Sequence, residues 1–430
     1  MIDYQQFLAS KRRMFGECGF EPDTLNKKLF AFQTRIVETA LRKGRYAIFA
    51  DCGMGKTLMQ LEWARRVSER ENRPVLTVTP LAVSAQTFDE AQRFGYMAEF
   101  SRRPNMTTPI QITNYSNIEH FEPSSFAGLV IDESSILKGD GPMRRSMQAF
   151  ADRIKYRLAC TATPAPNDFT ELGNHSEFVG SLSHSEMLAT YFVHDGGDTS
   201  KWRLKGHAKQ DFWRWVASWA MFCSKPSDLG FDDKGYNLPA LTYHQHEVGA
   251  GFDAGLLFDV EAESLSERRA ARKDSIEDRC AKAADMVNAS DESWVVWCNL
   301  NAESEKLASL IPDAIEVTGS DSDEHKADAM IGFAQGKHRV IVTKPSIAGW
   351  GMNWQHCRNQ VFVGLSDSWE QLYQAVRRSW RFGQQKEVHI HIVTSKAEGA
   401  VVRNIERKDK QAKELMNELS AIARSIYVSN

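Results

Sequence analysis

The clearest chemical signal in the chain is a glycine-rich turn that ends in lysine and threonine. The segment ADCGMGKT, residues 50–57, carries Gly53, Gly55, Lys56 and Thr57 between an apolar run and a helical pattern. Glycines at such a turn let backbone N–H groups surround phosphates at a helix N-terminus. The lysine then reaches the β- and γ-phosphates, and the threonine hydroxyl binds Mg²⁺. A plain tight turn is the alternative, but the combined pattern favours binding of ATP and Mg²⁺.

Two acidic residues follow a second apolar run. The segment LVIDESSILKG places Asp132 and Glu133 directly after a predicted buried strand. A carboxylate at such a strand end can bind magnesium, while the adjacent glutamate orients and polarises the attacking water. Acidic residues also begin many solvated loops, so the catalytic interpretation depends on the glycine-rich turn upstream.

Elements that would hold these residues recur in two blocks. Short apolar runs alternate with helical patterns at residues 46–49, 75–78, 129–131 and 157–160, and again at 294–298, 315–317, 340–342, 360–363 and 388–393. Strands buried on both faces and separated by helices predict parallel sheets covered by helices. At 430 residues the chain is also long enough for two domains. We expect an N-terminal domain over residues 1–240 and a C-terminal domain over 241–430.

The region between the blocks differs in composition. We expect a helical accessory segment at residues 181–236, rich in aromatic side chains. Phe212, Trp215, Trp219 and Phe222 fall on one helical face, which favours packing in a core over stacking on nucleic-acid bases. The stretch GYNLPALTYHQ indicates a crossover, residues 251–288 a charged helix, and the last 35 residues a closing amphipathic helix.

Further motifs in the first half complete a recognisable order. Phe32 and Gln33 precede the glycine-rich turn, TVTPLAVSAQ at 77–86 contains Thr79, and RLACTATPAPNDFTEL at 157–172 contains Thr161 and Thr163. In the second half, TKPSIAGWGMNW carries Gly349, Gly351 and Asn353, and QAVRRSWRFGQ carries Gln374, Arg378 and Arg381.

In this order the motifs resemble helicase superfamily two, and within it the Swi/Snf-type DNA translocases. The resemblance implies two tandem RecA-like domains, with Gln33 reading the adenine and Thr79 lying near the nucleic-acid backbone. It also implies that Thr161 and Thr163 couple ATP hydrolysis to nucleic-acid binding. Gly351, Asn353 and Gln374 would belong to the motifs of the second domain. Two serines replace the usual last letters of the DEAH-type box at 132–135. The set also resembles helicase-like proteins of phages and prophages, which implies the cytoplasm of a bacterium or of a phage-infected cell.

The arginine assignment also has a physical basis. Charge accumulates on the transferred phosphoryl group, so guanidinium groups delivered from a second domain stabilise the transition state. Arg378 and Arg381 are spaced to share a helical face. The alternative is a solvated basic helix surface.

Composition limits how nucleic acid could be bound. The net charge of −3 offers no attraction over the whole surface, so a polynucleotide would need a local basic groove. Candidate patches are residues 11–13, 102–103, 144–145 and 201–209. The seven cysteines form no C-x-x-C pair, and no apolar run has signal-peptide or membrane-spanning length. We therefore expect neither a structural zinc site nor a membrane segment.

These observations predict an ATP-dependent DNA translocase with duplex DNA as its track. A strand-separating helicase on DNA or RNA stays open as an alternative. Two other classes are a nucleotide-gated binding module that hydrolyses ATP negligibly and an ATPase that remodels proteins. The presence of Glu133 and of the arginine pair argues against a nucleotide-gated binding module, because a module that does not hydrolyse ATP does not need these catalytic residues.

Overall fold

The computed structural model describes residues 17–105, 107–139, 141–195, 198–249, 273, 275–348, 352–395 and 398–427. The chain divides into two compact units. Unit 1 comprises Met1–Asp233 and Ala412–Asn430, and unit 2 comprises Lys234–Gln411. The division falls a few residues before the expected boundary at 240, and the end of the chain groups with unit 1.

Unit 1 is built on a seven-stranded sheet in the order β3-β4-β2-β5-β6-β1-β9. All its neighbouring strands are parallel. The strands are β1 Arg45–Ala50, β2 Val75–Thr79, β3 Ala98–Phe100, β4 Ile110–Asn114, β5 Gly128–Asp132, β6 Tyr156–Thr161 and β9 Ala220–Cys223. Every residue of β2, β4, β5 and β6 is buried, as both faces of this sheet are covered.

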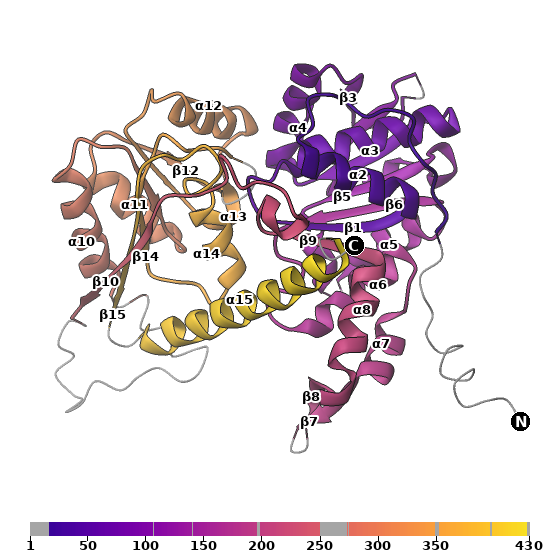
Figure 1. Cartoon of the computed structure of the whole chain (residues 1–430). Helices are drawn as coiled ribbons and strands as arrows, with labels where there is room; N and C mark the ends of the chain where they lie inside the picture. The colour runs from indigo at the N-terminus through magenta and orange to yellow at the C-terminus, as the bar shows by residue number, and fades with distance from the viewer. Residues whose placement is uncertain are drawn as a thin grey trace, which may run out of the picture. The chain divides into compact units, whose positions relative to one another are not determined.

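Helices cover both faces of this sheet (Figure 1). Helices α2, α3 and α4 pack together on one face, and α5, α6 and α8 lie on the other. Their bounds are α2 Ala31–Lys43, α3 Lys56–Glu71, α4 Leu81–Phe94, α5 Pro142–Ala151, α6 Leu172–Val179, α7 His184–Tyr191 and α8 Lys209–Trp219. Helix α3 buries Leu61, Trp63 and Val67 against the sheet and exposes arginine–glutamate pairs on its outer side.

The aromatic-rich segment packs in the core of unit 1, as expected, but it is only partly helical, and Phe222 lies on strand β9 and not on the helical face of Phe212, Trp215 and Trp219. Phe212, Trp215, Trp219 and Phe222 are all at most 7% exposed and belong to one hydrophobic cluster with β1 and α6. Their burial rules out stacking on bases for these four side chains. Besides α7 and α8, the segment contains a hairpin of β7 Phe192–Asp195 and β8 Asp198–Leu204, and its strand β9 extends the main sheet. Figure 1 shows the hairpin beyond the ends of α7 and α8.

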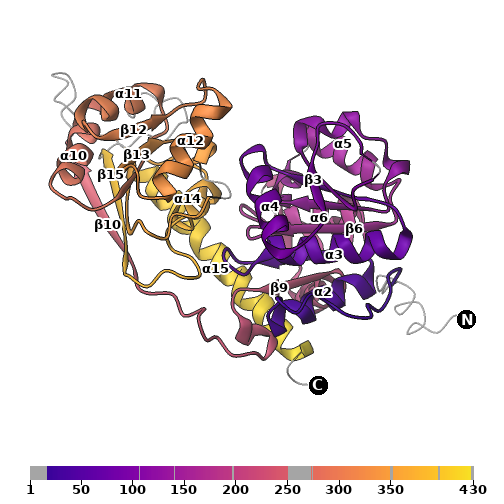
Figure 2. The ribbon, with the colours of Figure 1, turned by 90° about the horizontal axis from the view of Figure 1, so that it is seen from above.

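Unit 2 has its own parallel sheet in the order β10-β15-β14-β11-β13-β12. The strands are β10 Leu241–Val248, β11 Trp294–Trp297, β12 Ala314–Val317, β13 Val340–Thr343, β14 Asn359–Val363 and β15 Val388–Ser395. Helices α10 Ile276–Asn288 and α11 Asn301–Leu310 lie on one face, and α12 Asp323–Ala334, α13 Pro345–Ala348 and α14 Trp369–Val376 lie on the other (Figure 2). Two parallel sheets covered by helices confirm the expected fold class.

Two segments differ in detail from the sequence-based expectations, and a third agrees with them. The crossover at residues 235–245 ends in β10, an edge strand whose residues are mostly polar. The charged helix expected at 251–288 is described as α10 from Ile276, and residues 251–272 lie outside the described part. The closing amphipathic helix is confirmed as α15 Gly399–Tyr427, which buries Val401 and Ile405. Within the described ranges, no helix combines the length and apolarity needed to span a membrane.

Candidate nucleotide site

The candidate catalytic residues of unit 1 follow the carboxyl ends of neighbouring parallel strands. The glycine-rich turn follows β1, Asp132 ends β5, and Thr161 ends β6. Strand β6 pairs with both of the others, and Cys160 lies opposite Ile48 on one side and Asp132 on the other. Carboxyl ends of parallel strands share one sheet edge, which is where α/β folds bind ligands. The fold therefore brings the residues of the three motifs together.

The glycine-rich turn has the backbone geometry that its glycines allow. Gly53 and Gly55 have φ values of 85° and 79°, a region that residues with a side chain avoid. A Cβ on Gly55 would also lie 2.3 Å from Nε2 of Gln33. Helix α3 begins at Lys56 and has no acidic residue in its first turn and no side-chain cap. Its N-terminal amides and positive dipole end thus face the turn and suit an anion.

Lys56 and Gln33 both hold this turn through hydrogen bonds to backbone carbonyls. The Nζ of Lys56 donates to the carbonyl oxygens of Ala50, at 2.8 Å, and Asp51, at 3.3 Å. The Gln33 side chain accepts from the N–H of Phe30 and donates to the Met54 carbonyl, each at 2.9 Å. Gln33, expected to read the adenine, here connects helix α2 to the turn.

Asp132 is buried, and polar groups surround it. Gln60, one helical turn after Lys56, donates from Nε2 to Oδ1 of Asp132 at 2.6 Å. The Tyr115 hydroxyl donates to the Asp132 backbone carbonyl. Burial raises the pKa of Asp132, and the Gln60 hydrogen bond and the nearby Lys56 charge oppose that rise. A carboxylate that is costly to ionise without a cation is suited to binding one.

Glu133 adopts a backbone conformation that is rare for a residue with a side chain. Its φ and ψ are 52° and 53°, in the left-handed region. Such conformations cost about 1–3 kcal/mol and cluster at functional sites. Thr161 Oγ1 lies 3.5 Å from Glu133 Oε2 and accepts from the N–H of Thr163 at 3.1 Å. The two threonines therefore connect the acidic turn to the segment after β6.

A buried histidine supports the serine that follows this glutamate. Ser134 Oγ and His175 Nε2 of α6 are 3.0 Å apart, and both residues are fully buried. The His175 ring also meets Phe49 edge-on, with centroids 5.1 Å apart. Burial lowers the pKa of His175 to about 4, so its imidazole is neutral at pH 7. His175 thus contacts Ser134, the first of the two serines that replace the last residues of the DEAH-type box.

Thr79 is placed differently from the residues of the acidic turn. It is fully buried, and its hydroxyl lies 2.8 Å from the Ser84 hydroxyl within the start of α4. In this structure it organises the loop between β2 and α4. Its expected place near a nucleic-acid backbone stays a prediction.

The arginine motif of unit 2 is tied to the segment that precedes it. Arg378 is 3% exposed and bonds to the side chain and carbonyl of Gln374 at 3.0 and 2.8 Å. Arg378 and Arg381 both donate to the carbonyl of Met352, at 3.2 and 3.1 Å. Neither arginine lies in a helix, because α14 ends at Val376. The prediction that the two arginines share a helical face is therefore wrong. Turns position them instead.

The neighbouring G-x-G-x-N element is described only in part. Asn353 is exposed, whereas Gly349 and Gly351 lie outside the described residues. The Met352 carbonyl that both arginines share lies directly before Asn353. In unit 2, the two motifs are therefore physically joined.

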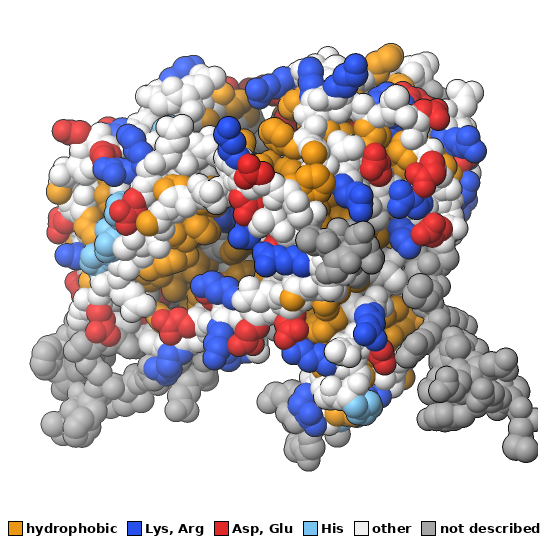
Figure 3. All heavy atoms as spheres, in the orientation of Figure 1, with side chains coloured by type: hydrophobic (Ala, Val, Ile, Leu, Met, Phe, Trp, Pro, Cys, Tyr) orange, Lys and Arg blue, Asp and Glu red, His pale blue; other side chains and the backbone are white. Residues whose placement is uncertain are grey.

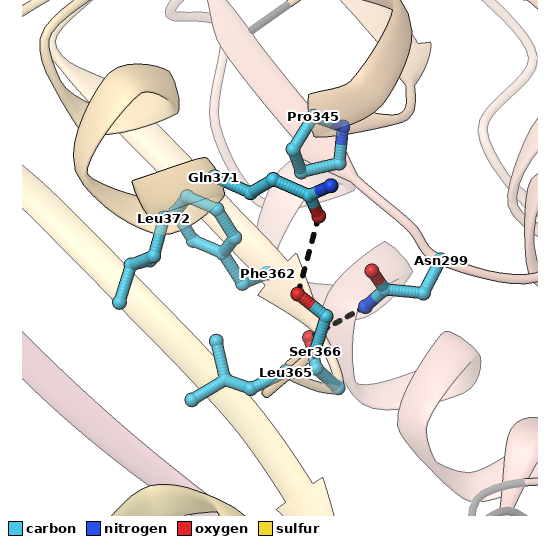
Figure 4. A pocket seen from close by; sticks show the side chains of 8 residues that line it. Asn299, Pro345, Phe362, Leu365, Ser366, Gln371 and Leu372 are labelled. Carbon is cyan, nitrogen blue, oxygen red and sulfur yellow. Dashed lines mark hydrogen bonds between the residues drawn. The ribbon is translucent and has the colours of Figure 1, made fainter. Parts of the chain in front are cut away.

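A small, mainly apolar hollow with a few polar side chains lies at the carboxyl edge of the sheet in unit 2 (Figure 4). Its lining comes from the residues that follow β11, β13 and β14, together with α14. Asn299 donates to the Gly364 carbonyl at 3.3 Å, and Ser366 donates to Gln371 at 3.2 Å. The remaining lining residues are Pro345, Phe362, Leu365 and Leu372.

The candidate basic patches are dispersed. On the face drawn in Figure 3, lysines and arginines lie among acidic side chains over both units. Arg144 is paired with Glu177 at 2.6 Å, and Lys209 with Glu418 at 2.5 Å. Arg102 and Arg103 are exposed, and residues 11–13 lie outside the described part. None of these patches identifies a nucleic-acid track by itself.

The residues at the edge of unit 1 fit a magnesium–nucleotide complex. The expected magnesium ligands, Thr57 and Asp132, supply hard oxygen donors, which Mg²⁺ prefers. The side-chain oxygen Oε1 of Gln60 is buried beside them without a hydrogen-bond partner among the described residues. An unsatisfied acceptor next to a buried carboxylate is expected where a hydrated cation binds.

Sequence reasoning did not single out Gln60, Tyr115 or His175. Gln60 had a usable signal, because it lies four residues after Lys56 and shares its helical face. Tyr115 and His175 are distant from the acidic turn in sequence, and only the packing of β4, α6 and β5 brings them to it.

Comparison with known proteins gives a structural likeness but no family. No protein-family model matches it, and no curated protein matches it. Among solved structures, it is similar to one described as a Sulfolobus solfataricus SWI2/SNF2 ATPase core in complex with dsDNA. The sequence identity is 16% and the TM-score 0.43, over 94% of this chain and 96% of the other. The function of the chain must therefore be argued from its own residues.

Proposed function

We propose that the chain is a DNA-dependent ATPase that moves along DNA by hydrolysing ATP. One observation carries the proposal: Lys56 follows β1, the buried Asp132 and the strained Glu133 follow β5, and these strands flank β6 at one sheet edge. This is the constellation that phosphoryl transfer to water needs, namely a phosphate cradle, a metal-binding carboxylate and a residue that positions water.

The chain's own groups would act in turn. When ATP binds, the Lys56 ammonium exchanges the carbonyls of Ala50 and Asp51 for phosphate oxygens. Glu133, held in its unusual backbone conformation, orients the attacking water and accepts its proton. Magnesium, bound through Thr57 and Asp132, would neutralise charge on the phosphates. Arg378 and Arg381 of unit 2 would supply the positive charge that stabilises the transition state.

Translocation would follow from making and losing this bridge. ATP links the two units while it is intact, and hydrolysis releases the link. If each unit holds the DNA backbone, one cycle advances the protein by one small step. The order of the motifs, with their resemblance to Swi/Snf-type translocases, supports duplex DNA as the track.

Two substitutions test the ATP site. Lys56→Ala should lower nucleotide affinity by about a hundredfold, because it removes the cation that contacts the phosphates. Glu133→Gln should retain binding but slow hydrolysis by about 10²–10⁴-fold, the usual contribution of a general base. Equilibrium binding of a fluorescent ATP analogue and steady-state phosphate release measure the two effects. Normal turnover in either variant would refute the assigned role.

The track is tested separately. ATPase rates without polynucleotide and with single-stranded DNA, duplex DNA or RNA should show the strongest stimulation by duplex DNA. Triplex displacement without separation of a forked duplex would then support translocation over unwinding. ATPase activity that no polynucleotide stimulates would contradict a nucleic-acid motor.

A further inference from the structure

Gln60 is a buried amide with one satisfied end and one unsatisfied end. It is fully buried on α3, and its Nε2 donates to Oδ1 of Asp132 at 2.6 Å. Its Oε1 has no hydrogen-bond partner among the described residues. A buried amide oxygen without a donor is unfavourable, so native proteins usually supply a protein or water donor for it.

We propose that Gln60 is a positioning residue for the magnesium ion that accompanies ATP. Its amide N–H donates to the Asp132 carboxylate. When Mg·ATP is bound, its Oε1 accepts a hydrogen bond from a water molecule on the ion. This role rests on the proposed function, because it assumes that the site takes Mg·ATP.

The orientation of the amide follows from its neighbours. An ionised carboxylate only accepts hydrogen bonds, so Gln60 must turn its NH₂ group toward Asp132. That choice leaves Oε1 as an acceptor in a buried setting. The Tyr115 hydroxyl does not supply a hydrogen bond to this oxygen, because it donates to the Asp132 backbone carbonyl.

The missing donor matches the chemistry of magnesium. Mg²⁺ dehydrates reluctantly and keeps several waters when one or two protein ligands and phosphates bind it. Each retained water donates hydrogen bonds strongly, because the ion polarises it. Such outer partners orient the directly bound ligands and commonly change metal affinity by about 10–100-fold when they are removed.

Gln60 also acts on the carboxylate that would bind the ion. Its Nε2 holds Oδ1 of Asp132 at 2.6 Å, which fixes the orientation of that carboxylate.

The test compares two substitutions with a matched control. Gln60→Met and Gln60→Leu both remove the two hydrogen-bonding ends, and Gln60→Met also keeps nearly the same volume. The control is Gln111→Met, a fully buried glutamine on β4 of the same unit that hydrogen-bonds to Asn105. Binding of a fluorescent ATP analogue is titrated at a series of free Mg²⁺ concentrations, and circular dichroism checks that each variant is folded.

The expected result separates a role toward the ion from a role in packing. In Gln60→Met the Mg²⁺ concentration for half-maximal binding should rise about tenfold, while affinity at saturating Mg²⁺ stays within about threefold of the parent. Gln111→Met should stay within about threefold throughout. An unchanged Mg²⁺ requirement in Gln60→Met or Gln60→Leu, or an equal rise in Gln111→Met, overturns the inference. If the unmodified protein binds no nucleotide at any Mg²⁺ concentration, the proposed function itself fails.

Discussion

At the scale of single residues, burial decides the charge of the groups around the acidic turn. Asp132 and His175 both lie in the interior, where the charged form of either is disfavoured. For Asp132 this favours pairing with a cation. For His175 it favours the neutral imidazole that contacts Ser134 and Phe49.

Acid should therefore destabilise the protein through His175. The folded state holds its pKa near 4, whereas the unfolded chain protonates the imidazole near its ordinary value of 6.5. Stability is fully present above pH 6.5 and falls as the pH drops toward 4, by up to about 3 kcal/mol for this group. In His175→Gln, denaturant unfolding at several pH values should show a correspondingly weaker loss over this window. An identical pH dependence in both proteins would contradict the assignment, since the other histidines are common to both.

At the scale of elements, the aromatic segment attaches helix α8 to the sheet of unit 1. Trp219 is fully buried and meets Phe49 and Trp215 edge-on, with centroids 6.2 and 5.4 Å apart. Strand β9 follows directly after α8 and pairs with β1, the strand that leads into the glycine-rich turn. Packing of α8 thus supports the strand that leads into the candidate nucleotide site.

Truncating Trp219 tests this attachment. Trp219→Ala should lower the free energy of unfolding by about 3–5 kcal/mol, the usual range for a buried aromatic residue. Trp202→Ala is the control, because Trp202 is only partly buried at the edge of the same cluster, and its loss should be smaller. Chemical denaturation measures both. Equal effects of the two substitutions would show that burial does not distinguish these tryptophans.

At the scale of the whole molecule, each unit has a hydrophobic core of its own. Unit 2 adds a buried ionic cluster in which Arg279 contacts Glu303 at 2.8 Å and Glu398 at 3.5 Å. All three side chains are fully buried. The cluster connects α10, the start of α11 and the residue before α15.

Removing the arginine should destabilise unit 2 selectively. Arg279→Met leaves two buried carboxylates without their cation, which costs about 3–5 kcal/mol. By calorimetry, we expect the transition of unit 2 to fall by about 10 °C. A non-hydrolysable ATP analogue should raise the transition of unit 1, because ligand binding stabilises the native state. An unchanged unfolding temperature in Arg279→Met would contradict the stabilising role assigned to the buried cluster.

The parts that could be predicted from sequence are those set by local patterns. The turn around Gly53 and Gly55 needs positive φ, and only glycine adopts it readily, so the spacing reveals it. Fully apolar runs likewise reveal the central strands. Edge strand β10 and the hairpin β7–β8 lack a fully apolar run. The spacing of Arg378 and Arg381 fits a helix as well as the turns that the structure shows, so spacing alone does not distinguish the two.

The sequence by itself determined the covalent order of glycine-rich turn, acidic box and arginine motif, and the alternation of strands and helices that predicts parallel sheets. Only the tertiary structure decided which distant side chains surround the acidic turn. Gln60 and Tyr115 reach Asp132, and His175 reaches Ser134, from three different segments through sheet order and helix packing. Local patterns record backbone conformation and burial, whereas a contact between segments depends on how the whole chain closes around its core.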